Sequence, residues 1–318
     1  MTAKVFNIVF MGTPEFAVPT LEKIITETAH HLIGVITQPD RPKGRGLKKI
    51  ESPVKKVAVR YGIPVLQPEK LRKSAREWLH QLQPDLIVVV AYGKILSKSI
   101  LQIPAWGCIN VHASLLPLYR GAAPINWALI KGETVSGITT MLMDPGMDTG
   151  DILLQEQCHI APHDTAETLH DSLAVMGATL LLQTLQKLST GDIEPQKQNE
   201  ALATYAPLLK KEDGRLNWLQ NSHEIYNFIR GLYPWPGAFT FYKHKRVKVL
   251  QATLEPAEQR SSHPPGSFLE FDKKQGLRVA TGSGSLWINK LQPESKGPLS
   301  ARDFYNGYRC QLRDCFTP

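Results

Sequence analysis

The sequence predicts an α/β protein in which a Rossmann-like, mostly parallel sheet domain is followed by a smaller domain of short strands. Strand and helix patterns alternate over the first two thirds of the chain, which is typical of a doubly wound parallel sheet. Beyond a polar segment at residues 189–207, proline and glycine separate short β-prone stretches. The chain has 318 residues, 42% of them hydrophobic, so it is long and apolar enough for two cores.

The elements of the first domain are predicted from apolar runs and helix-start signals. Residues 5–11 form a short strand, after which Thr13, Pro14 and Glu15 supply an N-cap, an N1 proline and an early acid for a helix. Ser52 and Pro53 open a second helix in the same way. Similar signals predict strands at 32–37 and 86–91, β-prone runs at 108–112 and 137–143, and a long helix from 164–167 to about Leu188.

A linker and a small barrel are predicted for the rest of the chain. The segment 189–207 is polar, contains Gly191 and lacks strong periodicity, as a linker between domains does. The predicted boundaries are therefore 1–189 for the first domain, 190–207 for the linker and 208–318 for the second domain. A short helix near 222–230 is followed by predicted strands at 238–242, 246–252, 267–271, 277–280 and 286–291. Five short strands in about a hundred residues are typical of a small barrel.

Composition indicates a cytoplasmic protein without a membrane partner. The first residues lack the apolar region of a signal peptide, and no apolar run approaches the ~20 residues of a membrane span. Neither a structural metal nor a disulfide framework is expected, because the four cysteines include no C-x-x-C pair and no histidine at zinc spacing. Cys158 and His163 are interpreted as residues at the end of a strand and in the turn after it. A metal site formed by them is the less favoured alternative.

Three polar residues in the segment 108–151 suit the attack of an amine on a carbonyl. Asn110 and His112 alternate with apolar residues, so in a strand their side chains share one face about 7 Å apart. Asp148 lies in a segment rich in proline and glycine that must be a turn or loop. Loops at strand ends carry the chemistry of open α/β sheets. Each residue alone would be interpreted as an ordinary core or turn residue, but their combination favours a catalytic site.

Residues 110–121, NVHASLLPLYRG, resemble the signature of the 10-formyltetrahydrofolate-dependent formyltransferases. The resemblance extends over nearly all of residues 5–306 and includes the segments 10–17, 37–46, 89–93 and 147–151. It implies an OB-like second domain and 10-formyltetrahydrofolate as the formyl donor. It also implies a folate-binding loop of Ser114, Leu115, Leu116 and Pro117. The apolar wall that contains Val89 and Tyr92 is expected to help bury the pterin of the folate.

The expected reaction is direct formyl transfer without a covalent intermediate, because no serine or cysteine lies in a recognisable nucleophile elbow. Asn110 is expected to donate a hydrogen bond to the developing oxyanion, and His112 to stabilise that charge and move protons. Asp148 is expected to orient and polarise His112 or a bridging water.

Positive charge is concentrated in two parts of the chain. Residues 208–318 contain 17 Lys and Arg against 10 Asp and Glu, and residues 41–60 contain eight basic side chains and one acid. Both segments suit a phosphate backbone, although solvated charged faces are the ordinary alternative. In the resembled family the corresponding loop enters the acceptor stem of the initiator tRNA. Arg45, between Gly44 and Gly46, is the expected inserted side chain, and the neighbouring candidates are Arg41, Lys43, Lys48 and Lys49.

Three functions remain open at this point. Formyl transfer to the α-amine of initiator methionyl-tRNA, with no protein partner required, explains both the three polar residues and the basic segments, and it is the predicted function. Transfer to a small amine, on a nucleotide amino sugar or a ribotide, leaves the basic segments unexplained. A nucleic-acid-binding module without chemistry leaves the 110–117 motif unexplained.

Overall fold

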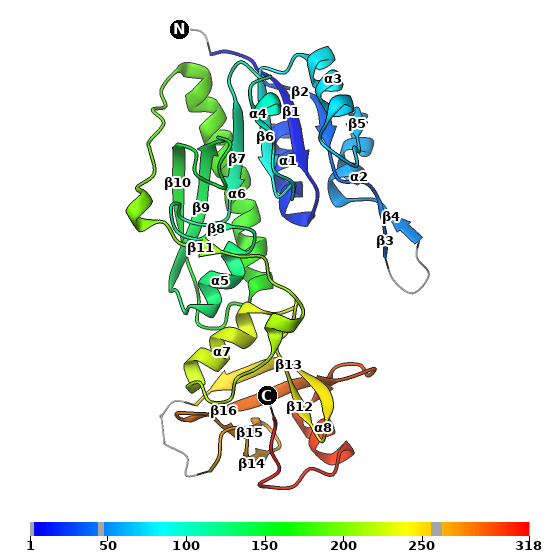
Figure 1. Cartoon of the computed structure of the whole chain (residues 1–318), viewed down its shortest axis with the longest axis vertical. Coiled ribbons are helices and arrows are strands. Elements are labelled where there is room, and N and C mark those ends of the chain that lie inside the picture. The colour runs from blue at the N-terminus through cyan, green and yellow to red at the C-terminus, as the bar shows by residue number, and fades with distance from the viewer. Residues whose placement is uncertain (1–2, 44–47, 256–262, 318) are drawn as a thin grey trace. The chain divides into compact units, whose positions relative to one another are not determined.

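The computed structural model describes residues 3–43, 48–255 and 263–317, and these form two compact units (Figure 1). Unit 1 comprises residues 1–124, 135–159 and 170–206, and unit 2 comprises residues 125–134, 160–169 and 207–318. The division is less simple than the predicted boundaries at 189 and 208, because two short internal segments group with the C-terminal part of the chain.

Unit 1 is built on a seven-stranded sheet, and the mostly parallel Rossmann-like prediction is confirmed. In spatial order the strands are β10 (Ile152–His159), β9 (Val135–Leu142), β7 (Cys108–His112), β6 (Leu86–Val90), β1 (Asn7–Gly12), β2 (His31–Ile36) and β5 (Val65–Leu66). The strands from β7 to β5 are parallel, whereas β9 is antiparallel to β7 and β10 is antiparallel to β9. The carboxyl ends of β1, β6 and β7 therefore meet at one edge of the sheet.

Helices cover both faces of this sheet, and burial on both faces is why β6 is apolar throughout. The helices are α1 (Val18–Glu27), α2 (Pro53–Arg60), α3 (Lys73–Leu82), α4 (Lys98–Leu101) and α6 (Ala166–Thr190). Gly177 of α6 lies so close to Val111 of β7 that a Cβ on it would come within 2.9 Å of the valine side chain. Because neighbouring residues of a strand point to opposite faces, Asn110 and His112 lie on the face of β7 away from α6.

One predicted helix start is confirmed and another is wrong. Ser52 caps α2 by accepting a hydrogen bond from the Lys55 amide. Thr13 does not cap a helix: a 3-10 turn, η1 (Glu15–Ala17), comes first, and α1 begins only at Val18. The reason is Pro19, which lacks an amide hydrogen and is therefore tolerated only in the first turn of an α-helix.

The segment predicted as a linker is packed against unit 1 over much of its length. Gln196 and Ile152 exchange two main-chain hydrogen bonds of 2.8 Å. The 3-10 helix η2 (Glu200–Leu202) follows, and then β11 (Tyr205–Ala206) pairs in parallel with β8 (Arg120–Gly121). The segment is therefore part of unit 1, and the last boundary between the units comes after residue 206.

Unit 2 contains α5 (Pro124–Ile130) from its second residue on, α7 (Ser222–Gly231) and an antiparallel sheet. All five predicted strands occur near their predicted places, with β17 (Leu299–Ser300) and α8 (Ala301–Gly307) added after them. Their bounds are β12 (Phe239–Tyr242), β13 (Lys245–Leu254), β14 (Phe268–Asp272), β15 (Gly276–Ala280) and β16 (Ser285–Pro293). The C-terminal residues 314–317 hydrogen-bond to both edge strands, to Phe241 of β12 and to Phe268 of β14, so the edges are joined as in a small barrel.

None of the helices in the described ranges combines the length and the apolar character needed to cross a lipid bilayer.

Candidate active site

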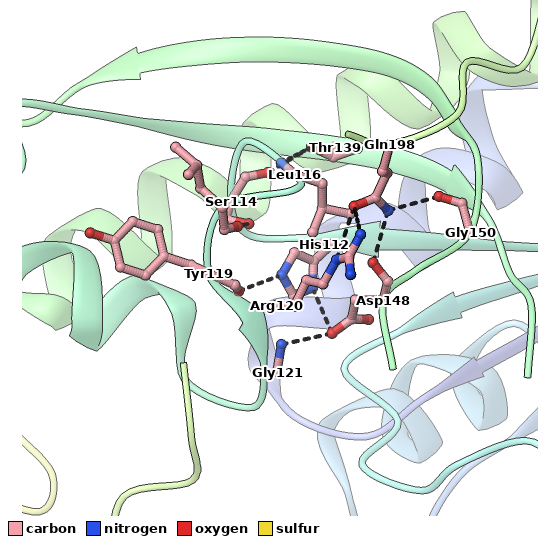
Figure 2. Close-up of polar contacts among 11 residues, drawn as sticks. His112, Ser114, Leu116, Tyr119, Arg120, Gly121, Thr139, Asp148, Gly150 and Gln198 are labelled. Atoms are coloured by element: carbon pink, nitrogen blue, oxygen red, sulfur yellow. Dashed lines mark hydrogen bonds and ion pairs between the residues drawn. The ribbon is translucent and has the colours of Figure 1, made fainter. Parts of the chain in front are cut away.

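Strand β7 carries two of the three predicted catalytic residues at the carboxyl edge of the parallel sheet. Asn110 is the register partner of Val89 in β6 and of Met141 in β9, and His112 is paired with Thr139 of β9. Their side chains share one face of β7 (Figure 2 shows His112) because the residues are two apart in the strand. His112 is 6% exposed, so its imidazole meets little water.

The hydrogen bond of His112 fixes the position of one ring proton. Nε2 lies 3.1 Å from the carbonyl oxygen of Tyr119, and a carbonyl only accepts, so Nε2 carries a hydrogen and donates it (Figure 2). In the neutral ring the lone pair is then on Nδ1. Nδ1 lies 3.7 Å from Oδ2 of Asp148, which is too long for a direct hydrogen bond, and the two form an ion pair only when the ring is protonated.

Asp148 reaches His112 from a turn that folds back along β7. Because β9 runs antiparallel to β7, its last residue, Leu142, is paired with Ile109 near the start of β7. The turn that follows nevertheless brings Asp148 to the end of β7. Asp148 has a left-handed backbone with φ of +55°, and its Oδ2 accepts a 2.9 Å hydrogen bond from the amide of Gly121.

The side-chain amide of Asn110 is available to a ligand. Asn110 is partly buried, and across residues 3–43, 48–255 and 263–317 no side chain or main-chain group hydrogen-bonds to its amide. An asparagine amide offers two N–H donors and one oxygen acceptor. The structure therefore brings Asp148 to His112, and it leaves the donors of Asn110 on the same face of β7.

The predicted folate-binding loop has a defined conformation. The Ser114 hydroxyl donates to the carbonyl of Leu118 at 2.6 Å, and the amide of Leu116 donates to Oγ1 of Thr139 at 3.1 Å. Gln155 of β10 donates from Nε2 to the carbonyl of Leu116 at 2.9 Å. The peptide bond between Leu116 and Pro117 is cis. Thr139 and Gln155 were not predicted as site residues, because in the sequence they are ordinary polar members of strands.

Leu115 packs where β9 has no side chain. A Cβ on Gly137 would come within 2.6 Å of the Leu115 side chain and within 2.2 Å of the carbonyl oxygen of Glu156. Gly137 therefore leaves the space that Leu115 occupies against the strand.

Val89 and Tyr92 lie in the core beside the site. They are 4% and 1% exposed and belong to an apolar cluster that includes Met11 and Leu96. The Tyr92 hydroxyl has no hydrogen-bond partner within the described part of the chain, and burial raises the pKa of Tyr92 to about 12. Val89 is the register partner of Asn110, so the two side chains lie on the same face of the sheet. Contact of the Tyr92 ring with a pterin remains a prediction.

Comparison with known proteins places this chain in a family. The family model described as formyl transferase matches residues 5–185, and the one described as formyl transferase, C-terminal domain, matches residues 208–309. A curated methionyl-tRNA formyltransferase of Citrifermentans bemidjiense is 50% identical over 306 residues, which are 96% of this chain and 94% of that protein. The chain belongs to the methionyl-tRNA formyltransferase family. Another member, from Caldanaerobacter subterraneus subsp. tengcongensis, is 50% identical over 95% of this chain and 97% of its own length.

Three solved structures share the fold of this methionyl-tRNA formyltransferase family member. The Clostridium thermocellum methionyl-tRNA formyltransferase has a TM-score of 0.56 at 20% identity and covers 79% of this chain and 94% of its own. An N-formyltransferase of Helicobacter canadensis, in complex with folinic acid and dTDP-3-aminofucose, has a TM-score of 0.66 at 20% identity over 91% and 100% of the two chains. HypX of Aquifex aeolicus, in complex with tetrahydrofolic acid, also has a TM-score of 0.66, at 17% identity; the match covers 97% of this chain but 48% of HypX.

The basic segment of this formyltransferase forms a hairpin. Strands β3 (Arg41–Lys43) and β4 (Lys48–Ile50) are antiparallel. Arg41 and Lys49 are exposed; Arg45 lies outside the described residues, as do the side chains of Lys43 and Lys48.

Not all of the predicted positive charge near this hairpin is free. Lys55 lies 2.6 Å from Asp40 and 3.1 Å from Glu51, and Arg60 lies 3.3 Å from Glu22. Hydrogen bonds from Gln67 and from Lys55 lower the pKa of Asp40, so this carboxylate stays charged and offsets the Lys55 ammonium. Within the described residues, the cations that remain without an ion-pair partner therefore include those of the hairpin itself.

Three residues beside His112 and Asp148 were not predicted as site residues. Arg120 is fully buried, and its guanidinium donates to Gln198 and to Glu200. The partners lie in the segment that was predicted as a linker. The polarity of that segment was the available signal, because a buried arginine requires polar groups as hydrogen-bonding partners.

Proposed function

We propose that this chain transfers the formyl group of 10-formyltetrahydrofolate to the α-amino group of initiator methionyl-tRNA. The observation that carries the proposal is the His112–Asp148 pair, with Nδ1 and Oδ2 3.7 Å apart, beside the Asn110 amide, to which no group of the described residues hydrogen-bonds. Membership of the methionyl-tRNA formyltransferase family, over both domains, supports the choice of substrate.

The catalytic pair suits an incoming amine. In the tautomer that donates from Nε2, Nδ1 of His112 and Oδ2 of Asp148 are both acceptors. Two acceptors this close leave a position between them that favours a group with several N–H donors. The methionyl amine is protonated in water near neutral pH. The pair would hold this ammonium and take up the proton that it must lose before it can attack.

The transfer then proceeds in two bond changes. The amine nitrogen forms a bond to the formyl carbon, and the bond between that carbon and N10 of the folate breaks. The ammonium loses two protons in all: the first passes to the His112–Asp148 pair before attack and from there to solvent, and the second, lost from the nitrogen once it is bonded to the formyl carbon, balances the proton that N10 gains. An N–H of Asn110 would donate to the oxyanion that develops on the formyl oxygen. The segment 114–117 would hold the folate, and this chemistry requires no metal.

The hairpin supports a polyanionic acceptor over a small one. Arg41 and Lys49 are exposed, and a row of cations of this kind attracts a phosphate backbone. We propose that Arg45, which lies between β3 and β4 in the sequence, enters the acceptor stem of the tRNA, with Lys43 and Lys48 as neighbouring contacts. The reaction would take place in the cytoplasm without a protein partner.

The deciding experiment offers both classes of acceptor to the purified protein. Radiolabelled 10-formyltetrahydrofolate is incubated with charged initiator tRNA or with nucleotide amino sugars and ribotide amines, and each product is separated and counted. Formylated methionyl-tRNA is expected, with no label on the small amines. The variant Asn110→Ala should lose this activity. Label on a small amine but not on the tRNA would overturn the proposal.

A further inference from the structure

We propose that Gln198 is a positioning residue for Asp148, which holds the turn that carries this carboxylate at the distance from His112 that the transfer needs. Gln198 itself lies outside the catalytic pair, in the segment between α6 and β11. The inference rests on the proposed function, because it assumes that the His112–Asp148 pair acts on the amine.

All four hydrogen-bonding positions of the Gln198 amide are used. Nε2 donates to the carbonyl oxygens of Asp148, at 2.8 Å, and of Gly150, at 2.7 Å (Figure 2). Oε1 accepts from Nε of Arg120 at 3.1 Å and from Nη2 at 2.9 Å. The orientation of the amide follows from chemistry, because a guanidinium only donates and a carbonyl only accepts. Reversing the amide would break all four bonds at once.

Arg120 gives Gln198 a rigid base. Its side chain is fully buried, and its guanidinium donates to both carboxylate oxygens of Glu200, at 2.7 and 2.8 Å. Its main-chain amide donates to the carbonyl of Thr204 at 2.8 Å. A bidentate pair of this kind defines direction as well as distance. The hydrogen bond with Arg120 lowers the pKa of Glu200, so the pair stays charged at neutral pH.

The network closes a ring around Asp148. Gly121, which follows Arg120 in the chain, donates its amide to Oδ2 of Asp148 at 2.9 Å. The same two-residue strand, β8, therefore reaches Asp148 twice: directly at the carboxylate, and through Gln198 at the carbonyl oxygen. Fixing a residue at both its main chain and its side chain removes the rotations that would carry the carboxylate away from His112.

Asp148 needs such a restraint. Its backbone lies in the left-handed region, which residues with a Cβ adopt at a cost, and Gly146 and Gly150 flank it within the turn. Asp144 closes the other side of the turn by accepting from the Gly146 amide and from the Thr149 hydroxyl. Without Gln198, the Asp148–Gly150 side of the turn would lose both of its side-chain bonds to the segment 196–206.

A merely structural role for Gln198 makes different predictions. The segment would remain docked without it, through the two main-chain bonds between Gln196 and Ile152 and through the pairing of β11 with β8. The neighbouring Gln196 is exposed and uses only its main chain in this contact, so Gln196→Ala is a matched control. Two substitutions of Gln198 distinguish the role of its acceptor oxygen from that of its donor nitrogen. Gln198→Ala removes both, whereas Gln198→Glu keeps an acceptor for Arg120 and removes the donor to the carbonyls.

The test uses the full-length protein with charged initiator tRNA and 10-formyltetrahydrofolate in single-turnover and steady-state assays. We expect Gln198→Ala to lower kcat roughly 10- to 100-fold, the range for a misplacement of about 1 Å, with each KM changed less than about threefold. Gln198→Glu should be at least as slow, because its carboxylate repels the two carbonyl oxygens. Gln196→Ala should retain the kcat of the unchanged protein.

Spectroscopy supplies a readout that does not depend on turnover. The ring resonances of His112, assigned with His112→Gln, should shift in Gln198→Ala and stay in place in Gln196→Ala. Near-normal kcat and unchanged His112 resonances in a folded Gln198→Ala protein would overturn the inference. Rescue of kcat by Gln198→Glu would also overturn it, since Arg120 alone would then be the partner that matters. Failure of the proposed function differs from both: the unchanged protein would not formylate the tRNA.

Discussion

His112 and Asp148 form the proposed catalytic pair, and the hydrogen bond of His112 indicates where its ring proton lies. The Tyr119 carbonyl holds the hydrogen on Nε2, so in the proposed mechanism Nδ1 and the carboxylate exchange protons with the substrate. Asp148 has a second task, since its Oδ2 accepts from Gly121 and thereby ties the turn to β8. The Asp148 carboxylate thus both places a negative charge beside His112 and fixes the position of its own turn.

Removing either member of the pair should affect the reaction far more than the fold. We expect His112→Ala and Asp148→Ala to lower kcat by about 10² to 10⁴-fold, the usual range for a positioned proton-transfer group. Asp148→Asn keeps an acceptor for the Gly121 amide but carries no charge, so it separates the two tasks of Asp148. Single-turnover rates and circular dichroism check this, and near-normal rates in a folded variant would exclude that residue from the mechanism.

Gly121 is a residue for which no other amino acid fits. Its φ is +120°, and a Cβ would lie 2.7 Å from the carbonyl oxygen of Ala206 in the paired strand. Gly121→Ala should therefore lower the free energy of unfolding by about 1–3 kcal/mol, from backbone strain alone, and it should also slow transfer. Urea unfolding measures the first effect. Gly297→Ala is the control, because a Cβ there meets nothing within 4 Å, and a loss equal to that of the control would contradict the assignment.

At the scale of elements, the sequence predicts what depends on local pattern. The alternation in β7 predicted that Asn110 and His112 share a face, and the apolar run 86–91 predicted β6. The position of Asp148 could be predicted only as a turn, because its approach to His112 depends on β9 running antiparallel to β7. Local pattern contains no information about that register.

The segment 190–207 is a second case in which local pattern was not enough to predict the structure. Its polarity predicted a solvated linker, since exposed and hydrogen-bonded polar side chains look alike in a sequence. Gln198 and Glu200 find their partner 78 and 80 residues away in Arg120. Only the tertiary fold brings that partner to them.

The burial of Cys108 in β7 predicts that its thiol reacts slowly. Burial raises the pKa of Cys108 to about 12, so at pH 8 roughly one thiol in ten thousand is the reactive thiolate. Iodoacetamide should label the exposed Cys315 long before Cys108, and any labelling of Cys108 should rise about tenfold per pH unit up to about pH 11. Mass spectrometry of peptides follows both sites. Equal labelling rates at pH 8 would show that β7 opens readily.

At the scale of the whole molecule, charge divides unevenly along the chain. Residues 208–318 carry 17 basic and 10 acidic side chains, and the β3–β4 hairpin adds exposed cations from unit 1. Counts of charge are available from the sequence, and so this feature was predicted. Which cations are already paired, such as Lys55 with Asp40, required the structure.

Salt dependence measures how much of this charge meets the tRNA. If the hairpin neutralises phosphates, log K for tRNA should fall linearly with log salt, by about 0.7 to 0.9 for each phosphate contacted. The double variant Arg41→Ala, Lys49→Ala should bind tRNA more weakly with a shallower slope, whereas its affinity for folate should be unchanged. Lys73→Ala on α3 removes one charge elsewhere as a control. An unchanged slope in the double variant would show that the hairpin is only a solvated surface.

The pairing of Arg120 with Glu200 also sets an order of events during protein synthesis. The two residues are 80 positions apart, which corresponds to about 4–16 s of elongation at 5–20 residues per second. During that interval Glu200 has not been made, so the guanidinium of Arg120 lacks the carboxylate partner that it has in the finished fold. Asp148 likewise emerges before the amide that holds its turn. The hydrogen-bond network around His112 and Asp148 is therefore completed late, after nearly all of unit 1 has been synthesised, and a prematurely terminated chain would carry the 110–121 motif without this network.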